Sequence, residues 1–170
     1  MKQTDVKIFV IVFLIIPLLL SCNSQETKSP KDFTKDKSAI NQSIQDWDNA
    51  WENKNVELAI KHYSDKTDWT NAFGRRVQSK DELKDLLKFI FNMDFVMDGE
   101  NNYGKNEITF LNDSTATVRS KNIRINQRWP DGSRMDDRHI NHLRIYQNIN
   151  GNWLITNHMI SQAWPHKNPE

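Results

Sequence analysis

The spacing of apolar residues changes along this chain from a helical period to alternation, and this change limits the folds that it can adopt. From about residue 37 to residue 91, apart from one short strand, apolar residues recur every three or four positions, which is typical of amphipathic helices. After Met93 they alternate with polar residues in runs separated by turn signals, which is typical of strands. Helices first and long antiparallel strands afterwards favour an α+β fold over a parallel sheet.

Three helices are predicted in the first part of the chain. The first covers about residues 37–53, and Asn55 could cap a second, shorter one. A third begins at Ser79-Lys80-Asp81-Glu82, a capping-box pattern in which the end residues satisfy each other's backbone amides. The apolar stripes of these helices are Ile40, Ile44, Trp47 and Trp51, then Val56, Ala59, Ile60 and Tyr63, then Leu83, Leu86, Leu87, Ile90 and Phe91.

Strands are predicted between the second and third helices and along the rest of the chain. Trp69, Asn71 and Phe73 alternate with their neighbours, which predicts a short strand that ends at Gly74. Later strands end near Phe110 or cover about 115–128, 136–148 and 152–162, separated by the turn signals Asn112-Asp113-Ser114, Pro130-Asp131-Gly132 and Asn150-Gly151.

The strand at 115–128 has a fault in its alternation. Ala116 and Val118 have even numbers, whereas Ile123 and Ile125 have odd numbers. A β-bulge near residues 119–122 would bring all four to one face and would bend the sheet.

The amino terminus is typical of a bacterial signal peptide. Lys2 and Lys7 lead into an apolar run over 8–20, which is shorter than the about 20 residues that cross a bilayer but fits a secretory signal. The run ends in Leu19-Leu20-Ser21-Cys22, which resembles the lipobox of bacterial lipoproteins. Cys22 is the only cysteine, so lipidation explains it better than a disulfide; the alternative is an ordinary signal peptide or anchor with a chance cysteine.

Four parts of the chain follow from this pattern. Residues 1–21 would be a signal peptide and 22–36, polar and with almost nothing apolar, a flexible tether. Residues 37–164 would form the folded domain and 165–170 a tail. We expect acyl chains on Cys22 to hold the protein on a membrane of the cell envelope, the outer membrane by preference.

The charge balance excludes some classes of partner. The predicted signal peptide holds Lys2, Lys7 and Asp5, so the 23 basic and 22 acidic residues of the chain fall to 21 of each. A neutral domain argues against binding of nucleic acid or of anionic membrane surfaces. With the one thiol used for lipidation, no cysteine zinc site is expected, and the chain lacks a glycine-rich dinucleotide motif. No cofactor is predicted.

Two stretches carry a family resemblance. AWENKNVELAIKHYSDKTDWTNAFG (50–74) and RIYQNINGNW (144–153) resemble the SnoaL-like branch of the nuclear-transport-factor-2-like superfamily, and the resemblance covers about residues 38–164. It implies a cone, in which a strongly bent antiparallel sheet wraps the long first helix, with two further helices and an open pocket. Members include isomerases, dehydratases, cyclases, hydrolases and association domains, so the fold leaves the function undecided.

The strand pattern predicts which side chains line this pocket. If the apolar residues of each strand face the interior, neighbours of the same parity face it too. Aromatic walls with a few polar groups would suit a small apolar ligand, although the tryptophans could be core and the amides could satisfy backbone groups. The predicted ligand-binding residues are Trp69, Asn71, Asn141 and Asn157, joined by Tyr63, Asp137 and His139.

Asp137 and His139 are the candidates for chemistry. They lie on one face of a strand, about 6–7 Å apart, so the carboxylate could orient the imidazole for acid–base catalysis, with Tyr63 as another partner. The plainer reading is a structural histidine beside a solubilising aspartate. His139 and His142 project to opposite faces of a strand, and no metal site is expected.

Three functions remain open at this point. The first is a membrane-tethered domain that binds a small molecule, the second an isomerase or hydrolase-like enzyme that uses His139, and the third a dimerising interaction domain. An open cavity would favour the first two, whereas a cone plugged by Trp47, Trp51 and Trp69 would favour a homodimer.

Overall fold

The computed structural model describes residues 31–163. The predicted signal peptide, Cys22 and the tail at 165–170 lie outside the described residues. No helix in the described range is long and apolar enough to cross a membrane. The elements are α2 (Thr34–Glu52), α3 (Val56–Ile60), β1 (Tyr63–Thr70), β2 (Arg76–Val77), α4 (Lys80–Phe91), α5 (Asp94–Met97), β3 (Glu100–Tyr103), β4 (Glu107–Asn112), β5 (Thr115–Ile125), β6 (Arg138–Ile149) and β7 (Asn152–Ala163).

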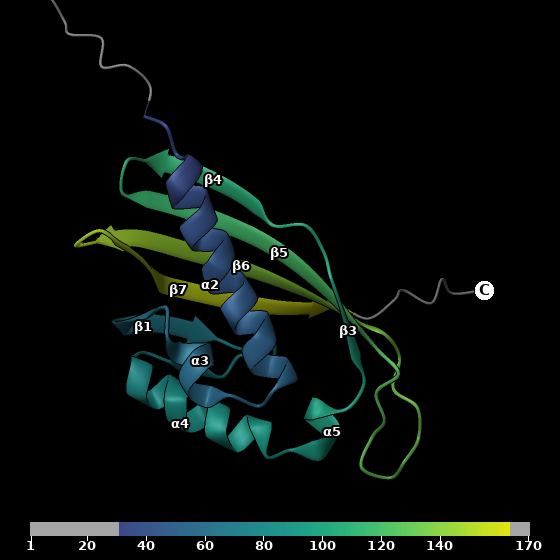
Figure 1. Cartoon of the computed structure of the whole chain (residues 1–170). Coiled ribbons are helices and arrows are strands. Elements are labelled where there is room, and N and C mark those ends of the chain that lie inside the picture. The colour runs from purple at the N-terminus through teal and green to yellow at the C-terminus, as the bar shows by residue number, and fades with distance from the viewer. Residues whose placement is uncertain (1–30, 164–170) are drawn as a thin grey trace, which may run out of the picture. The chain divides into compact units, whose positions relative to one another are not determined.

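The described strands form one curved sheet, with α2 lying across one of its faces (Figure 1). Its strand order is β2-β1-β7-β6-β5-β3, and β4 also pairs with β5. The α+β prediction is confirmed, but the sheet is mixed and not purely antiparallel, because β1 runs parallel to β7. The helices that follow α2 include the short α5 besides the two that were predicted.

The first helix begins earlier than its apolar stripe suggests. It starts at Thr34, inside the range predicted as a tether. Asp32 Oδ1 accepts a hydrogen bond from the Thr34 amide at 2.9 Å, and the Phe33 ring stacks on Phe110 with centroids 4.0 Å apart. Asp36 Oδ1 accepts a hydrogen bond from Trp153 Nε1 at 2.8 Å. These contacts order a polar segment that has no helical apolar pattern of its own.

The second helix and first strand meet at a different place than predicted. The short α3 ends at Ile60, and Tyr63 is the first residue of β1, not part of the helix. Asn71 lies beyond β1 in a turn, where its amide donates to the Arg75 carbonyl at 2.9 Å. Residues 61–68 are mostly polar and show no alternation of apolar residues. The position of this strand is therefore set by its pairing with β7.

The third helix starts where the capping box predicts. Ser79 Oγ accepts a hydrogen bond from the Glu82 amide at 3.2 Å. The Glu82 carboxylate reaches back to the Gln78 amide at 2.8 Å, one residue before the position that the pattern names. The element α5 and strand β3 were not predicted, because residues 94–103 are largely polar and carry no clear period.

The predicted bulge in β5 is wrong. Register between β5 and β6 is continuous from Thr115 opposite Gln147 to Arg124 opposite Arg138. The even residues of β5 therefore stay on the inner face throughout, including the buried polar pair Asn122 and Arg124. The inward-facing residues are apolar only in the first half of this strand, and polar in the second half.

A bulge is present instead in β7. Tyr146 pairs with Ile155 and Ile145 pairs with Asn157, so Thr156 is the extra residue. Before it the odd residues are buried, whereas after it His158 faces inward. The turn before this strand matches its prediction, since Asn150 and Gly151 have φ of 53° and 84°, which suits a tight hairpin.

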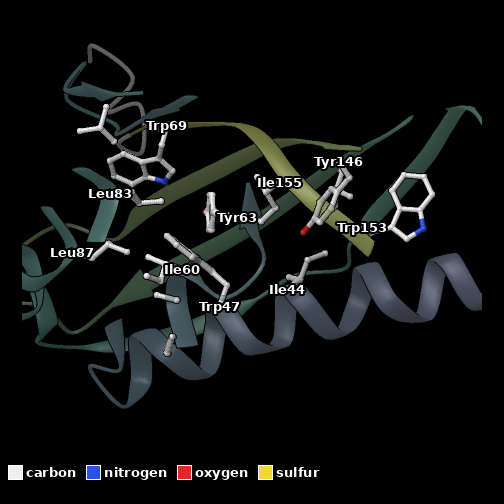
Figure 2. Packing of buried hydrophobic residues seen from close by; sticks show 14 of the residues in the cluster. Ile44, Trp47, Ile60, Tyr63, Trp69, Leu83, Leu87, Tyr146, Trp153 and Ile155 are labelled. Atoms are coloured by element: carbon white, nitrogen blue, oxygen red, sulfur yellow. The ribbon is translucent and has the colours of Figure 1, made fainter. Parts of the chain in front are cut away.

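The core lies between α2, α4 and the inner face of the sheet (Figure 2). Trp47 is 4% exposed, and its ring centroid lies 5.7 Å from that of Tyr63. One turn before Trp47 in α2, Ser43 Oγ and Tyr146 Oη share a hydrogen bond of 2.7 Å, which ties the helix to β6. This packing leaves the end of the sheet near α4 and α5 unfilled.

Candidate functional site

A cavity of about 350 Å³ lies beyond the core, between the C-terminal half of α2, α4, α5 and the inner face of the sheet. Within the described range, its lining combines fifteen apolar residues with ten polar ones. The apolar lining residues are Trp47, Trp51, Trp69, Ala72, Phe73, Leu86, Phe89, Ile90, Met93, Phe95, Val96, Trp129, Met135, Ile140 and Ile160. The polar ones are Asp48, Asn71, Arg75, Asn101, Tyr103, Asn122, Arg124, Arg138, His142 and Gln162.

Three residues singled out from the sequence lie at or behind this wall. Trp69 and Asn71 line the cavity, as the sequence predicted. Their role in ligand binding stays a prediction. The Asn71 carboxamide oxygen is already used by the amides of Phe73 and Arg75, at 2.9 and 2.8 Å, so it shapes the turn. Tyr63 is buried behind the wall and is not among the lining residues.

The predicted orientation of the other site residues is wrong. Asp137, His139, Asn141 and Asn157 are absent from the cavity lining. On β6 the even residues face inward, since Leu143 is 39% exposed whereas Arg144 is 1% exposed. Apolar Leu143 and Ile145 misled the assignment because they lie on the outer face. Asn157 faces outward because of the bulge at Thr156.

Asp48 is the carboxylate that enters the cavity. It follows Trp47 on α2 and lies one turn before Trp51, so these two indoles border it. Burial raises the pKa of Asp48 to about 6, with Arg144 opposing and Glu52 adding to this effect. No hydrogen bond to its carboxylate is formed by the described residues. Asp48 can therefore bind or release a proton near neutral pH.

A hydrogen-bonded chain of three side chains reaches the cavity from the core. Tyr63 Oη lies 2.6 Å from His158 Nδ1, and His158 Nε2 lies 2.9 Å from His142 Nδ1. His158 is 1% exposed, and His142 lines the cavity. Burial, and after it the charge of Arg144, lowers the pKa of both imidazoles well below the usual value, so both are neutral.

The chain fixes where each proton lies. Burial raises the pKa of Tyr63 well above its usual value, so the phenol stays protonated. Its O–H has no other acceptor among the described residues, so it donates a hydrogen bond to His158 Nδ1. A neutral imidazole accepts at one nitrogen and donates from the other, so His158 Nε2 donates to His142 Nδ1. His142 then carries its proton on Nε2, which has no hydrogen-bond partner within residues 31–163 and can donate to a ligand.

Arg144 supplies the positive charge behind this arrangement. It is 1% exposed, and its Nη1 donates to Ser120 Oγ at 2.9 Å. Its guanidinium carbon lies 5.8 Å from the ring centre of Trp47, within range of a cation–π interaction. The charge disfavours protonation of both histidines and stabilises ionised Asp48, so one buried cation tunes both kinds of group.

Sequence reasoning missed Asp48, His142 and the arginines of the cavity. Asp48 had a usable signal, because it lies three residues before Trp51 on the edge of the apolar stripe. His142 could have been found from Tyr146, a bulky residue of the same parity on the last part of β6. Within residues 31–163, no three His, Cys, Asp or Glu side chains are grouped as a metal site would need.

Solved structures share this fold. A ketosteroid isomerase-like protein from Erwinia carotovora atroseptica is 16% identical over 78% of this chain and 100% of its own, with a TM-score of 0.65. An NTF-2-like protein of unknown function from Shewanella oneidensis is 17% identical over 74% and 98% of the two chains, with a TM-score of 0.59. A putative scytalone dehydratase from Novosphingobium aromaticivorans is 14% identical over 75% and 84%, with a TM-score of 0.58.

Sequence comparison adds nothing to this likeness, since no protein-family model and no curated protein sequence matches the chain. At these sequence identities the structural similarity is evidence for the fold alone. The described domain therefore has the α+β fold of nuclear-transport-factor-2-like and ketosteroid isomerase-like proteins, as the resemblance of its sequence predicted.

Proposed function

We propose that this domain binds a small, mostly apolar molecule in its cavity and moves a proton on it, as an isomerase or a dehydratase does. The observation that carries the proposal is Asp48, a carboxylate in an apolar cavity with a pKa of about 6. Structural relatives described as ketosteroid isomerase-like and as a putative scytalone dehydratase are consistent with such chemistry. The open cavity favours this function over a domain whose only role is to dimerise.

The two polar groups would have complementary roles. Asp48, ionised above pH 6, would take a proton from a carbon next to a carbonyl of the ligand. The Nε2–H of His142 would donate a hydrogen bond to the carbonyl oxygen, on which negative charge develops as the proton leaves. His158 and Tyr63 would hold His142 in the donating tautomer. The proton on Asp48 would then return to another carbon or assist departure of a hydroxyl group.

Hydrogen–deuterium exchange tests this proposal without knowledge of the natural substrate. The wild-type protein in D₂O should accelerate exchange of the α-protons of some member of a panel of one- and two-ring ketones, followed by NMR. Asp48→Asn should reduce this rate about 10²–10⁴-fold, because the amide cannot accept the proton. The wild-type rate should rise with pH through about 6 and then level off, as the carboxylate ionises.

Two controls make the result specific. Asp65 is exposed on β1, so Asp65→Asn should leave exchange unchanged. His139→Gln should also retain the rate, whereas the mechanism predicted from the sequence requires its loss. Asp48→Asn should be no less stable than wild type at pH 8, because a carboxyl whose pKa is raised by folding destabilises the fold increasingly as pH rises from its ordinary value of 3.8 through about 6. Absence of protein-dependent exchange for the whole panel, or full activity of Asp48→Asn, would overturn the proton-transfer role.

We also propose that the mature protein is anchored to a membrane of the cell envelope through acyl chains on Cys22. The support is the sequence Leu19-Leu20-Ser21-Cys22 behind an apolar run of signal-peptide length. Residues 23–31 would then connect the acylated cysteine to the folded domain, which begins close to Asp32.

The homodimer that the sequence left open as an alternative stays a prediction. Leu143 and Met159 are directly opposite each other on β6 and β7 and are 39% and 58% exposed. They lie on the face of the sheet that is turned away from the cavity. A dimer through this face would leave access to Asp48 unchanged.

A further inference from the structure

Two arginines lie side by side on the inner face of the sheet. Arg124 on β5 is directly opposite Arg138 on β6, and both line the cavity. Like charges directly opposite each other in an antiparallel pair destabilise a sheet. Arg124 is 5% exposed, so water screens this repulsion poorly. A feature of this kind needs a compensating anion or another reason to persist.

The protein itself supplies only neutral partners at hydrogen-bonding distance. Arg124 Nε donates to the Asp98 carbonyl at 2.9 Å, and neither of its Nη atoms has a partner among the described residues. Arg138 donates from Nε to Gln162 Oε1 at 2.7 Å and from Nη1 to Gln127 Oε1 at 3.1 Å. In residues 31–163, no carboxylate forms an ion pair with either guanidinium.

The nearby acidic groups compensate the pair only in part. Burial lowers the pKa of Arg124, while Tyr103, Glu52 and Asp98 oppose the shift. Burial and the charge of Arg124 lower the pKa of Arg138 to about 10, and no acidic group opposes that shift. Both guanidiniums are therefore charged at neutral pH, and the charge of Arg138 is balanced by none of the described carboxylates.

Arg138 is held in place before any ligand arrives. Gln127 is 1% exposed, and its Nε2 donates to the carbonyls of Phe95 and Val96 at 3.2 and 3.3 Å. The amide oxygen of Gln127 must therefore point toward Arg138. A guanidinium fixed in this way loses little side-chain entropy when it binds an anion.

We infer that the ligand of this cavity is an apolar small molecule that carries an anionic oxygen group, such as a carboxylate, which binds between Arg124 and Arg138. The unpartnered Nη atoms of Arg124 offer hydrogen bonds in the planar arrangement that a carboxylate accepts. Phe95, Trp129, Met135 and Ile140 line the same cavity and would contact the apolar body. This inference rests on the proposed use of the cavity as a ligand site, and it adds the chemical class of the ligand.

Matched pairs of ligands test the inference by binding alone. A panel of one- and two-ring aromatic acids, such as benzoate, cinnamate and 2-naphthoate, is compared with the corresponding primary amides by calorimetry at pH 7.5. The wild-type protein should bind at least one acid about 10–100-fold more tightly than its amide, as expected for charge-assisted hydrogen bonds. Arg138→Gln should remove this preference and bind the acid no better than the amide.

The controls separate an anion site from a structural role. Arg119 is exposed on the outer face of β5, so Arg119→Gln should keep the preference for the acid. Arg138→Gln should have a urea midpoint equal to or higher than wild type, because it relieves the repulsion with Arg124. A lower midpoint with the acid preference intact would show that Arg138 is a structural residue and would overturn the inference, as would a panel in which no acid binds more tightly than its amide.

Failure of this inference can be told apart from failure of the proposed proton transfer. Asp48→Asn should keep the acid preference while losing α-proton exchange. Loss of the acid preference in Arg138→Gln would support the anion site, and loss of exchange in Asp48→Asn would support the proton transfer. Exchange without any acid preference in the wild-type protein would leave the proposed function standing and remove the anion site alone.

Discussion

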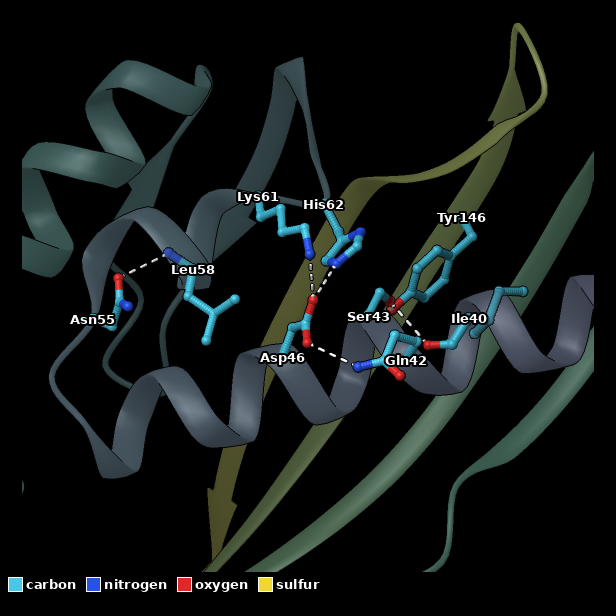
Figure 3. Close-up of polar contacts among 9 residues, drawn as sticks. All are labelled: Ile40, Gln42, Ser43, Asp46, Asn55, Leu58, Lys61, His62 and Tyr146. Atoms are coloured by element: carbon cyan, nitrogen blue, oxygen red, sulfur yellow. Dashed lines mark hydrogen bonds and ion pairs between the residues drawn. The ribbon is translucent and has the colours of Figure 1, made fainter.

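Two aspartates of α2 show how strongly the position of a carboxylate determines its chemical properties. Asp46 lies on the side of the helix that meets α3, where Lys61 Nζ and His62 Nε2 contact its Oδ2 at 2.9 and 2.7 Å (Figure 3). Its Oδ1 accepts a hydrogen bond from Gln42. Asp48, two residues later, points into the cavity without such partners. The first carboxylate stabilises the fold, and the second is left free to react.

A change of Asp46 should therefore reduce stability in a pH-dependent way. Hydrogen bonding to His62, reinforced by Lys61 and Gln42 against burial, lowers the pKa of Asp46 to about 2. A lowered carboxyl pKa gives stability that is fully present above about pH 4 and is lost as pH falls through the folded-state value. Asp46→Asn should lower the free energy of unfolding by about 1–2 kcal/mol at pH 7 and by much less near pH 2.

Urea denaturation at the two pH values measures this difference. The exposed control Asp65→Asn should match wild type at both. Equal stability of Asp46→Asn and wild type at pH 7 would mean that the contacts of Asp46 contribute nothing net.

Single residues were the hardest level to predict from the sequence. Trp69 was placed at the cavity wall because an aromatic residue at the end of a strand carries a clear apolar signal. His142, Arg124 and Arg138 were missed because buried polar residues look like surface residues in a hydrophobicity pattern. Their burial depends on a cavity and on a cross-strand hydrogen-bond network, neither of which has a local signature.

At the scale of elements, α2 supports both the core and the site. The apolar residues Ile40, Ile44 and Trp47 of this helix are buried against the sheet. Asp48 directly follows Trp47 in the helix. The indole of Trp47 also packs in a T-shaped arrangement with the His158 ring, with centroids 5.3 Å apart. Packing of this helix therefore sets the position of the reactive carboxylate.

Removal of the Trp47 side chain should be costly for this reason. Trp47→Ala should lower the free energy of unfolding by about 3–5 kcal/mol, the range for large aromatic truncations in cores. Trp129 is 43% exposed, so Trp129→Ala serves as a matched control with a small effect. Chemical denaturation with tryptophan-independent detection, such as far-UV circular dichroism, compares the variants. A denaturant midpoint of Trp47→Ala close to wild type would mean that α2 is peripheral.

Elements were predictable where local chemistry specifies them. The capping box of α4 and the Asn150-Gly151 turn are short-range signals, and both have the predicted effect in the structure. Strand faces were less predictable, because polar residues line much of the cavity end of β5 and β6, whereas Ile123, Ile125 and Leu143 lie on the outer face. One bulge, at Thr156, changes the inward-facing residues of β7 from odd-numbered to even-numbered ones. The position of this bulge depends on pairing with β6.

At the scale of the whole molecule, the fold separates the site from the surfaces that could bind other partners. The reactive groups Asp48 and His142 line the interior of the curved sheet, whereas exposed Leu143 and Met159 lie on its outer face. A dimer through the outer face and a ligand in the cavity could therefore be accommodated together. The fold class was predicted correctly because it follows from the order and period of the elements, which survive errors in the orientation of individual strands.

The predicted lipid anchor determines where the whole protein is located in the cell. In a bacterial host, the full-length protein should partition into the detergent phase and carry acyl mass on Cys22 after loss of residues 1–21, since Ser21-Cys22 ends an apolar signal. Cys22→Ala should remain uncleaved and without acyl mass, because the thiol that accepts the lipid is gone. Ser24→Ala, in the adjacent polar segment, is a matched control that should be processed like wild type. Intact-mass spectrometry of the detergent-phase protein distinguishes these species. Acylation that persists in Cys22→Ala, or a wild-type protein without acyl mass, would reject the anchor while leaving the function of the folded domain to be decided by Asp48.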